Sequence, residues 1–390
     1  MRSLTETLIF FSVACTGWAL VHFGLYRGLR HAFPEEKRKL FIAALIAGFS
    51  LAPLSMLLAR SGLPSDVIQI FSRVAFIEAG FVSLVFLLIV LRAIVGLISR
   101  PFASKVKTTR RDFLRRASDL SIGAIALIVG GTGIATAMRE PQVVRVPIRI
   151  KRLGDRFEGY RIVQLSDFHI GPAFREAGVR MVVDKVNALD PDLIVITGDL
   201  IDGYVHELRP HVTPLADLKA RDGVYFATGN HEYYWGGEEW IEHLVELGIP
   251  TLRNEARLIE REGEGLILAG CTDYRMGASI EGDASDPVKA AEGMPRALPK
   301  ILLAHQPQSV YAASEAGYDL QLSGHTHGGQ FFPFTWLIHL FQPFVAGLDR
   351  YQGTQLYVNR GTGFWGPAMR HGGEGEITEI ILQKSSSEQA

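Results

Sequence analysis

Two histidines separated by one residue form the clearest candidate for chemistry in this sequence. His325 and His327 lie in the segment 324–330 (Gly-His-Thr-His-Gly-Gly-Gln), directly after the apolar run 318–322. A strand that ends in a turn at this point brings both imidazoles to the rim of a sheet, and the flanking glycines permit the bend. Neutral imidazole nitrogens bind borderline divalent metals well. The spacing therefore predicts a metal site, provided that the rest of the chain supplies further ligands.

Further candidate ligands follow other apolar runs of the chain. Each of them alone has an ordinary interpretation as a turn or cap residue, because Asp, Asn and Gly are common in turns. Their repetition is not ordinary, since five predicted strands each end in a His, Asp or Asn. Besides the histidine pair, the candidates are Asp167, His169, Asp199, Asn230, His231 and His305.

The elements that must position these residues alternate between strands and helices. Apolar runs predict strands at 143–150, 160–166, 192–197, 224–228, 266–270, 300–304, 318–322, 355–359 and 376–382. Helical apolar spacing predicts helices at 174–189, 240–247 and 310–316. This alternation is typical of an α/β fold, in which ligands bind beyond the carboxyl ends of the strands. We therefore expect the candidate residues to lie together at that edge.

In their order along the chain, the motifs resemble those of the calcineurin-like metallophosphoesterase superfamily. The matching motifs are Asp167-x-His169, Gly198-Asp199-x-x-Asp202, Gly229-Asn230-His231-Glu232, His305 and Gly324-His325-Thr326-His327. The resemblance covers residues 160–382, and no ligand position is missing. It implies the fold of that family, an α/β sandwich of two central β-sheets flanked by helices, within a domain that we expect at 141–390.

The resemblance also implies a dinuclear metal centre. The implied ligands are Asp167, His169, Asp199 and His327 for one divalent ion, and Asp199, Asn230, His305 and His325 for the other. Asp199 would bridge two ions about 3.5–4 Å apart, and a water shared by them would attack the phosphorus. Mixed imidazole and carboxylate ligands suit Mn, Fe, Zn or Co, and the sequence does not choose among these metals.

Two residues beside the implied ligands have catalytic roles by the same resemblance. His231 would lie over the phosphate and stabilise charge or protonate the leaving oxygen. Asp202 would orient His231, as a carboxylate beside a histidine commonly does. The alternatives are a purely structural role for His231 and an ordinary turn residue at Asp202.

The first part of the chain, residues 1–140, differs in composition from the rest. Four long apolar runs lie at about 8–26, 40–59, 71–98 and 120–138. Each approaches the roughly 20 apolar residues that a membrane-spanning helix needs, so we predict four transmembrane helices. Glu78 and Arg92 are costly in lipid, and we expect them to face other helices or to lie near helix ends.

The loops between these runs predict how the protein is oriented in the membrane. Lys and Arg are abundant after the first and third runs, which predicts a multi-pass protein of the cell (inner or plasma) membrane with its second domain on the extracytoplasmic side. The segment Thr109–Arg115 resembles a twin-arginine export motif, and Ala135-Thr136-Ala137 has the form of a cleavage site. The alternative is an ordinary basic loop before an uncleaved helix. With the motif Tyr357–Gly363, this layout resembles a bacterial subgroup of exported phosphodiesterases.

An aromatic run follows the histidine pair, with six aromatic residues in 14 positions: Phe331, Phe332, Phe334, Trp336, Phe341 and Phe344. Pro333 and Pro343 interrupt it, so it is too short to span a membrane. One interpretation is packing beneath the active site. The other is an apolar lip on the substrate side, formed by residues such as Phe331, Trp336 and Phe341, that contacts lipid or an acyl chain.

These inferences predict a membrane-anchored, metal-dependent phosphoester hydrolase, acting on a phosphodiester of a lipid or another cell-envelope molecule. The net charge of −1 gives no field that favours nucleic acid. The alternative enzyme is a UDP-2,3-diacylglucosamine-type pyrophosphate hydrolase, although that substrate is cytoplasmic. The alternative from another class is an inactive ligand-binding or sensor membrane protein, which predicts a missing ligand. The physiological substrate and the oligomeric state do not follow from the sequence.

Overall fold

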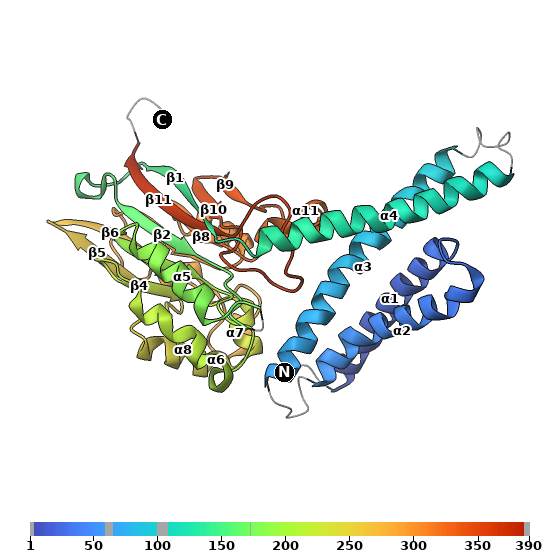
Figure 1. The fold of residues 1–390 in the computed structure, drawn as a ribbon. Helices are drawn as coiled ribbons and strands as arrows, with labels where there is room; N and C mark the ends of the chain where they lie inside the picture. The colour runs from blue at the N-terminus through green and yellow to red at the C-terminus, as the bar shows by residue number, and fades with distance from the viewer. Residues whose placement is uncertain (1–3, 59–64, 100–107, 172, 386–390) are drawn as a thin grey trace. The chain divides into compact units, whose positions relative to one another are not determined.

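The computed structural model describes residues 4–58, 65–99, 108–171 and 173–385 (Figure 1). The chain divides into two compact units. The first comprises Met1–Thr136 and Gly366–Met369, and the second comprises Ala137–Trp365 and Arg370–Ala390. Each unit has its own packing, and the candidate residues for chemistry all belong to the second.

The first unit contains the long helices α1 (Leu4–Leu29), α2 (Glu35–Leu58), α3 (Ser65–Ser99) and α4 (Thr108–Ala137). Within the described residues, three segments are long and apolar enough to cross a membrane: Glu35–Ser55, Val67–Ser99 and Phe113–Ala137. The first predicted span forms α1 but is not among these three, so a fourth span stays a prediction. The predicted loops fall partly on residues 59–64 and 100–107, which lie outside the described residues.

Glu78 and Arg92, two of the charged residues within the third apolar run, have partners on other helices, as expected from the cost of charge in lipid. Glu78 on α3 lies 3.2 Å from the Nε2 of His22 on α1. Arg92 on α3 forms an ion pair with Asp119 on α4. His22 and Asp119 are themselves buried, so each pair gives one carboxylate oxygen a partner inside the helical unit.

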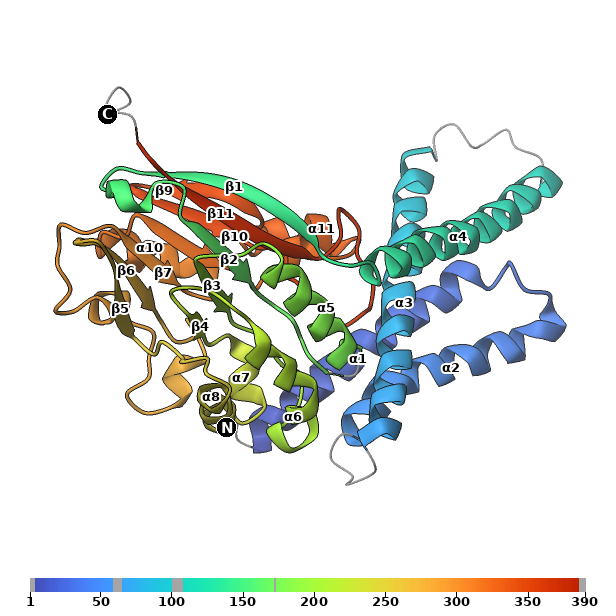
Figure 2. The ribbon, with the colours of Figure 1, turned by 60° about the vertical axis from the view of Figure 1, so that its left-hand side comes forward.

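The second unit is a sandwich of two mixed sheets, which confirms the fold that the family resemblance implied (Figure 2). In spatial order, the first sheet contains β1 (Gln142–Ile150), β11 (Glu376–Lys384), β2 (Arg161–Leu165), β3 (Leu193–Thr197) and β4 (Val224–Ala227). The second contains β5 (Glu255–Arg261), β6 (Glu264–Gly270), β7 (Lys300–Leu303), β8 (Leu320–Ser323), β10 (Thr354–Val358) and β9 (Gly347–Tyr351). Strands β2–β4 run parallel to one another, and so do β6, β7, β8 and β10.

The apolar strands of the first sheet are buried on both faces. Alternate residues of a strand point to opposite sides, so Ile162 and Val195 pack toward the second sheet while Val163 and Ile194 pack toward helices. The helices on this outer face are α5 (Glu176–Asn187), α6 (Val205–Val212) and α8 (Gly237–Glu246), whose Trp240 is fully buried. Burial on both faces explains why these strands read as continuous apolar runs.

The remaining helices of the second unit are short: α7 (Asn230–Tyr234), α9 (Pro287–Ala290), α10 (Val310–Glu315) and α11 (Phe334–Leu337). Sequence patterns did not predict β5 or β9, because both are edge strands with a half-exposed, charged surface. The expectation of one common sheet edge also needs correction. The candidate residues follow β2, β3 and β4 of the first sheet and β7 and β8 of the second, so both sheets contribute to one site.

Candidate metal centre

Five of the predicted ligands have a left-handed backbone, which is uncommon for residues other than glycine. Their φ angles are +52° at Asp167, +50° at His169, +51° at Asp199, +72° at His325 and +51° at His327. Such conformations cost free energy and persist where the surrounding structure fixes them, which happens most often at functional sites. At each of these strand ends the chain therefore turns sharply and places a polar side chain at the same end of the sandwich.

Two glycines allow the strand ends to approach one another. A Cβ atom at Gly324 would lie 2.0 Å from the Oγ of Ser166 and 2.1 Å from the Oδ2 of Asp167. A Cβ atom at Gly198 would lie 2.5 Å from the backbone nitrogen of Gly229 and 2.7 Å from the Nδ1 of His305. Side chains larger than hydrogen at these positions would push the two sheets apart at the site.

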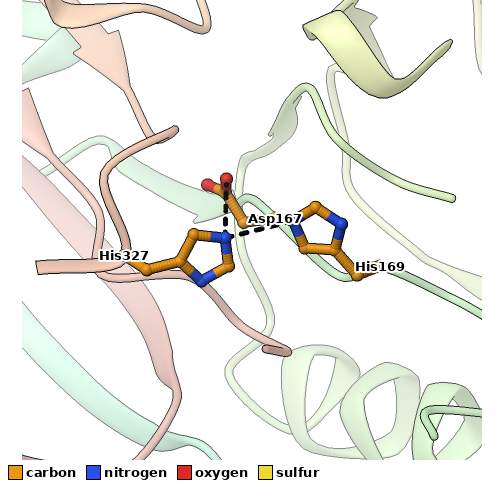
Figure 3. Close-up of side chains that lie close together, drawn as sticks. All are labelled: Asp167, His169 and His327. Carbon is orange, nitrogen blue, oxygen red and sulfur yellow. Dashed lines mark hydrogen bonds and ion pairs between the residues drawn. The ribbon is translucent and has the colours of Figure 1, made fainter. Parts of the chain in front are cut away.

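The first cluster of candidate ligands contains Asp167, His169 and His327, which converge from β2 and β8 (Figure 3). The Nε2 atoms of His169 and His327 are 3.1 Å apart. The Nε2 of His327 also lies 3.3 Å from the Oδ1 of Asp167. All three residues are buried, so their polar atoms face one another rather than solvent.

The second cluster contains Asp199, His305 and His325. The Oδ2 of Asp199 lies 3.1 Å from the Nε2 of His305, which is in turn 3.2 Å from the Nδ1 of His325. The same carboxylate oxygen is 3.9 Å from the Nε2 of His169. Asp199 thus lies between the two clusters and contacts a histidine of each.

The residues of both clusters fit divalent cations. Their imidazole nitrogens and carboxylate oxygens are the donors that borderline divalent metals prefer. In addition, the Oδ1 of Asn230 is buried and has no hydrogen-bond partner among the described residues. A buried polar atom without a partner is costly, and a cation would satisfy this oxygen. The structure therefore brings all seven predicted ligands to one region, with an amide oxygen in need of a partner.

Electrostatic interactions within the clusters shift the pKa values of their members. Burial alone would raise the pKa of Asp167, but the charges of His327 and His305 outweigh it and hold that pKa below its ordinary range. Burial likewise lowers the pKa of His305, but the charge of Asp199 outweighs it and raises that pKa. Burial, together with His305, lowers the pKa of His325 to about 4. In the metal-free protein His325 is thus neutral at neutral pH and His305 is protonated, so a cation that binds both must displace a proton from His305.

His231 and Asp202 lie beside these clusters and contact one another. The Nδ1 of His231 is 2.5 Å from the Oδ1 of Asp202, which also lies 3.2 Å from the Nδ1 of His169. Burial disfavours charge on His231, but the charge of Asp199 and the hydrogen bond to Asp202 outweigh it and raise its pKa to about 9. Asp202 therefore contacts two histidines of the site at once, which favours the predicted orienting role over that of an ordinary turn residue.

Glu232 is a buried residue whose role the sequence did not reveal. Its carboxylate accepts hydrogen bonds from the backbone N–H groups of Gly229, Asp199 and Leu200, at 2.6, 3.1 and 2.8 Å. It thereby ties the end of β3 to the start of α7. The spacing Gly229-x-x-Glu232 is the sequence feature that could have indicated this capping role, because a Glu at the third position of a helix commonly caps the helix start.

Two half-exposed aromatic side chains flank His231, and neither was predicted. The ring centroid of Tyr234 lies 5.3 Å from that of His231, and the ring of Trp365 lies 5.8 Å away. Trp365 is far from His231 in the sequence, so no local pattern could reveal the contact. Among the residues predicted on the substrate side, Trp336 and Phe341 are 66% and 73% exposed, which excludes core packing for these two. Phe331 is partly buried.

Replacing Asp202 with Asn should lower the pKa of His231 in chelator-treated protein. The raised pKa means that protonated His231 stabilises the metal-free fold fully below pH 6.5, and that this contribution is lost as pH rises through about 9. We expect Asp202→Asn to move the pKa toward 6.5, as measured by NMR titration of isotopically labelled histidine. Asp217→Asn, at an exposed aspartate paired with Arg180, is the control. An unchanged pKa in Asp202→Asn would refute the ion pair.

Comparisons with known proteins agree with this geometry. The family described as calcineurin-like phosphoesterase matches residues 160–329. A "Transmembrane protein with metallophosphoesterase domain" from Danio rerio is 39% identical over 74% of this chain and 67% of its own length. An "Uncharacterized metallophosphoesterase" from Helicobacter pylori is 32% identical over 83% of this chain and 84% of its own length.

Other relatives differ in how much of their length this chain matches. A metallophosphoesterase from Bacillus subtilis is 31% identical over 72% of this chain and 99% of its own length. The chain spans 56–67% of the length of the animal relatives from Danio rerio, Bos taurus and Caenorhabditis elegans. The chain thus belongs to the calcineurin-like phosphoesterases, a family of metal-dependent phosphoester hydrolases.

Proposed function

We propose that this protein is a membrane-anchored phosphodiesterase with two divalent ions in its active site. The position of Asp199 between two ligand clusters carries the proposal. One ion would be held by Asp167, His169, Asp199 and His327, and the other by Asp199, Asn230, His305 and His325. His231 is left out of both sets because the family resemblance gives it a place over the phosphate, although its Nε2 lies as close to the Oδ2 of Asp199 as the Nε2 of His169 does, at 3.9 Å.

Bound divalent ions would offset the negative charge of a phosphoester and lower the pKa of water at the site. The set of imidazole, carboxylate and amide donors suits Mn, Fe, Zn or Co. Asn230 contributes an oxygen without charge, so the ligands do not cancel the positive charge that attracts a phosphate. The buried carboxylates Asp167 and Asp199 are held ionised by the neighbouring histidines and are therefore ready to bind cations.

His231 would donate the proton that the leaving oxygen requires. Its Nδ1 is engaged by Asp202, which leaves the Nε2 to face the substrate. The backbone N–H of His231 donates to the Oδ1 of Asp199 at 2.9 Å and thereby holds the backbone of His231 beside the ligand clusters. A positioned general acid of this kind contributes roughly 10²–10⁴-fold to a rate. Asp202 acts as a positioning residue through its contact with His231.

The substrate that we propose is a phosphodiester of a lipid or another cell-envelope molecule. Exposed aromatic side chains at Trp336 and Phe341, together with three apolar helices in the same chain, support this choice. A UDP-2,3-diacylglucosamine-type hydrolase is the alternative, and the orientation predicted by the basic loops disfavours it. A sensor on an inactive scaffold would lack a ligand, whereas every predicted ligand residue is present here.

Hydrolysis of bis-p-nitrophenyl phosphate by the purified full-length protein tests the enzymatic proposal. We expect turnover with added Mn²⁺ and its loss with chelator. His231→Asn should reduce kcat by about 10²–10⁴-fold without changing the bound metal, because neither proposed ligand set includes His231. The exposed His206 provides a matched control, and His206→Asn should retain wild-type turnover. Activity that survives complete chelation, or a His231→Asn variant as active as the control, would refute the mechanism.

The orientation of the catalytic domain can be tested with reporters fused after Ala137, the last residue of α4. We expect alkaline phosphatase at this position to be active in a bacterial host, because the basic loops predict an extracytoplasmic domain. A fusion after Arg30, in the first basic loop, should be inactive. The opposite result would be an inactive alkaline phosphatase after Ala137 together with a fluorescent green fluorescent protein at the same position. It would contradict the predicted orientation and favour the UDP-2,3-diacylglucosamine-type hydrolase, whose substrate is cytoplasmic.

A further inference from the structure

A half-open cavity of about 650 Å³ lies in the second unit beside the first ligand cluster. Its volume is within the range of small-molecule binding sites. His327 forms part of its wall, so the cavity adjoins a predicted metal ligand. The rest of the wall comes from residues between Gly328 and Asp349 and from Arg360, Arg370, His371, Gly372 and Gly373. The proposed function assigns no role to this space.

Arg370 contributes a buried positive charge to the wall. Its side chain is 3% exposed, and its Nη2 donates to the carbonyl oxygens of Arg360 and Gly361, both at 2.9 Å. A Cβ atom at Gly361 would lie 3.0 Å from this Nη2 and 2.8 Å from the Nδ1 of His327, so Arg370 lies next to the cluster. No carboxylate in the described part of the chain forms an ion pair with Arg370. A buried cation is costly. The nearby carboxylates of Asp167 and Glu376 offset this cost in part, and an anionic ligand in the cavity would offset it further.

Arg360 contributes a second positive charge, which is accessible from solvent. Its Cγ lies 3.4 Å from the position of a Cβ atom at Gly328, which fixes the start of the side chain against the turn after His327. Among the described residues, no carboxylate forms an ion pair with the guanidinium of Arg360. Asp349 is the one carboxylate among the described residues that line the cavity. The cavity therefore has an excess of positive charge.

An exposed apolar surface adjoins the cavity. It contains Trp336 and Phe341 of the predicted apolar lip but not the partly buried Phe331, and Phe334, Leu337 and Leu340 extend it; from here on the apolar lip means these five exposed residues. Trp336 both lines the cavity and packs edge-on against Phe332, with 4.4 Å between the ring centroids. Exposed apolar surfaces of this kind mark interaction sites, and tryptophan is favoured where lipid meets water. An amphiphile is the ligand that matches cations inside and apolar side chains at the edge.

We infer that this cavity binds a second anionic group of a lipid substrate, held by Arg360 and Arg370, while the acyl chains contact the apolar lip. The inference rests on the proposed function, because the phosphodiester to be cleaved would lie at the neighbouring ligand clusters. It names the substrate class more closely: a lipid phosphodiester whose headgroup carries a further phosphate or carboxylate. Water would add to phosphorus, one P–O ester bond would break, and the proton would pass to the leaving oxygen.

The test compares two soluble lipids that differ by one phosphate, dioctanoyl phosphatidylglycerol and dioctanoyl phosphatidylglycerol phosphate. With full-length protein in a non-ionic detergent, we expect kcat/KM for cleavage of the shared phosphodiester to be about tenfold higher for the second lipid, as one charge-assisted contact allows. Arg360→Gln should abolish this preference and Asp349→Asn should increase it. Arg350→Gln, at an exposed arginine outside the cavity, should preserve it. Equal preference in Arg360→Gln and Arg350→Gln would overturn the inference.

A binding measurement separates this inference from the proposed function. Chelator-treated protein should bind dioctanoyl phosphatidylglycerol phosphate, as followed by tryptophan fluorescence, and Arg360→Gln should weaken binding about tenfold. The double variant Trp336→Ser, Phe341→Ser should weaken binding of the lipid but not of glycerol bisphosphate. If glycerol bisphosphate binds as tightly as the lipid, the ligand is soluble and the inference is wrong. Arg360-dependent binding without hydrolysis of any ester would uphold the subsite and refute the enzymatic proposal.

Discussion

The buried carboxylate of Asp199 is the constraint on which the rest of the catalytic domain depends. It follows β3 of the first sheet, yet it contacts His305, which follows β7 of the second sheet, at 3.1 Å. A charge in this position is tolerated only when opposite charges surround it, and His169 and His231 lie close to it as well. The two sheets must therefore meet at their carboxyl ends, and the apolar core between them, with residues such as Ile162 and Leu303, holds that alignment.

Several unfavourable local features become understandable from this constraint. Left-handed backbone at Asp167, Asp199 and His327 costs free energy, as does the burial of Glu232. The close approach of strand ends requires glycine at positions such as Gly198 and Gly324. Hydrogen bonds from backbone N–H groups to Glu232 then fix the loop ends without using any ligand side chain. Together, these features preorganise the site before any ion or substrate binds.

Except for the edge strands β5 and β9, the described strands and their polar ends were predictable from sequence, because local apolar patterns and short motifs encode them. Glu232 was part of a predicted motif, but its hydrogen bonds to Asp199 and Leu200 join segments that no local pattern connects. The same holds for Trp365 beside His231 and for the cavity lined by Arg360 and Arg370. The membrane region was predictable only in part. Hydropathy and length support three spans and leave the helix α1 unassigned.

Anomalous diffraction from crystals of the metal-loaded protein tests the dinuclear centre most directly. Data collected on both sides of the absorption edge of the bound metal should show two peaks about 3.5–4 Å apart, with the carboxylate of Asp199 between them. One ion should then lie among Asp167, His169 and His327, and the other among Asn230, His305 and His325. A single peak, or two peaks without Asp199 as a shared ligand, would contradict the account.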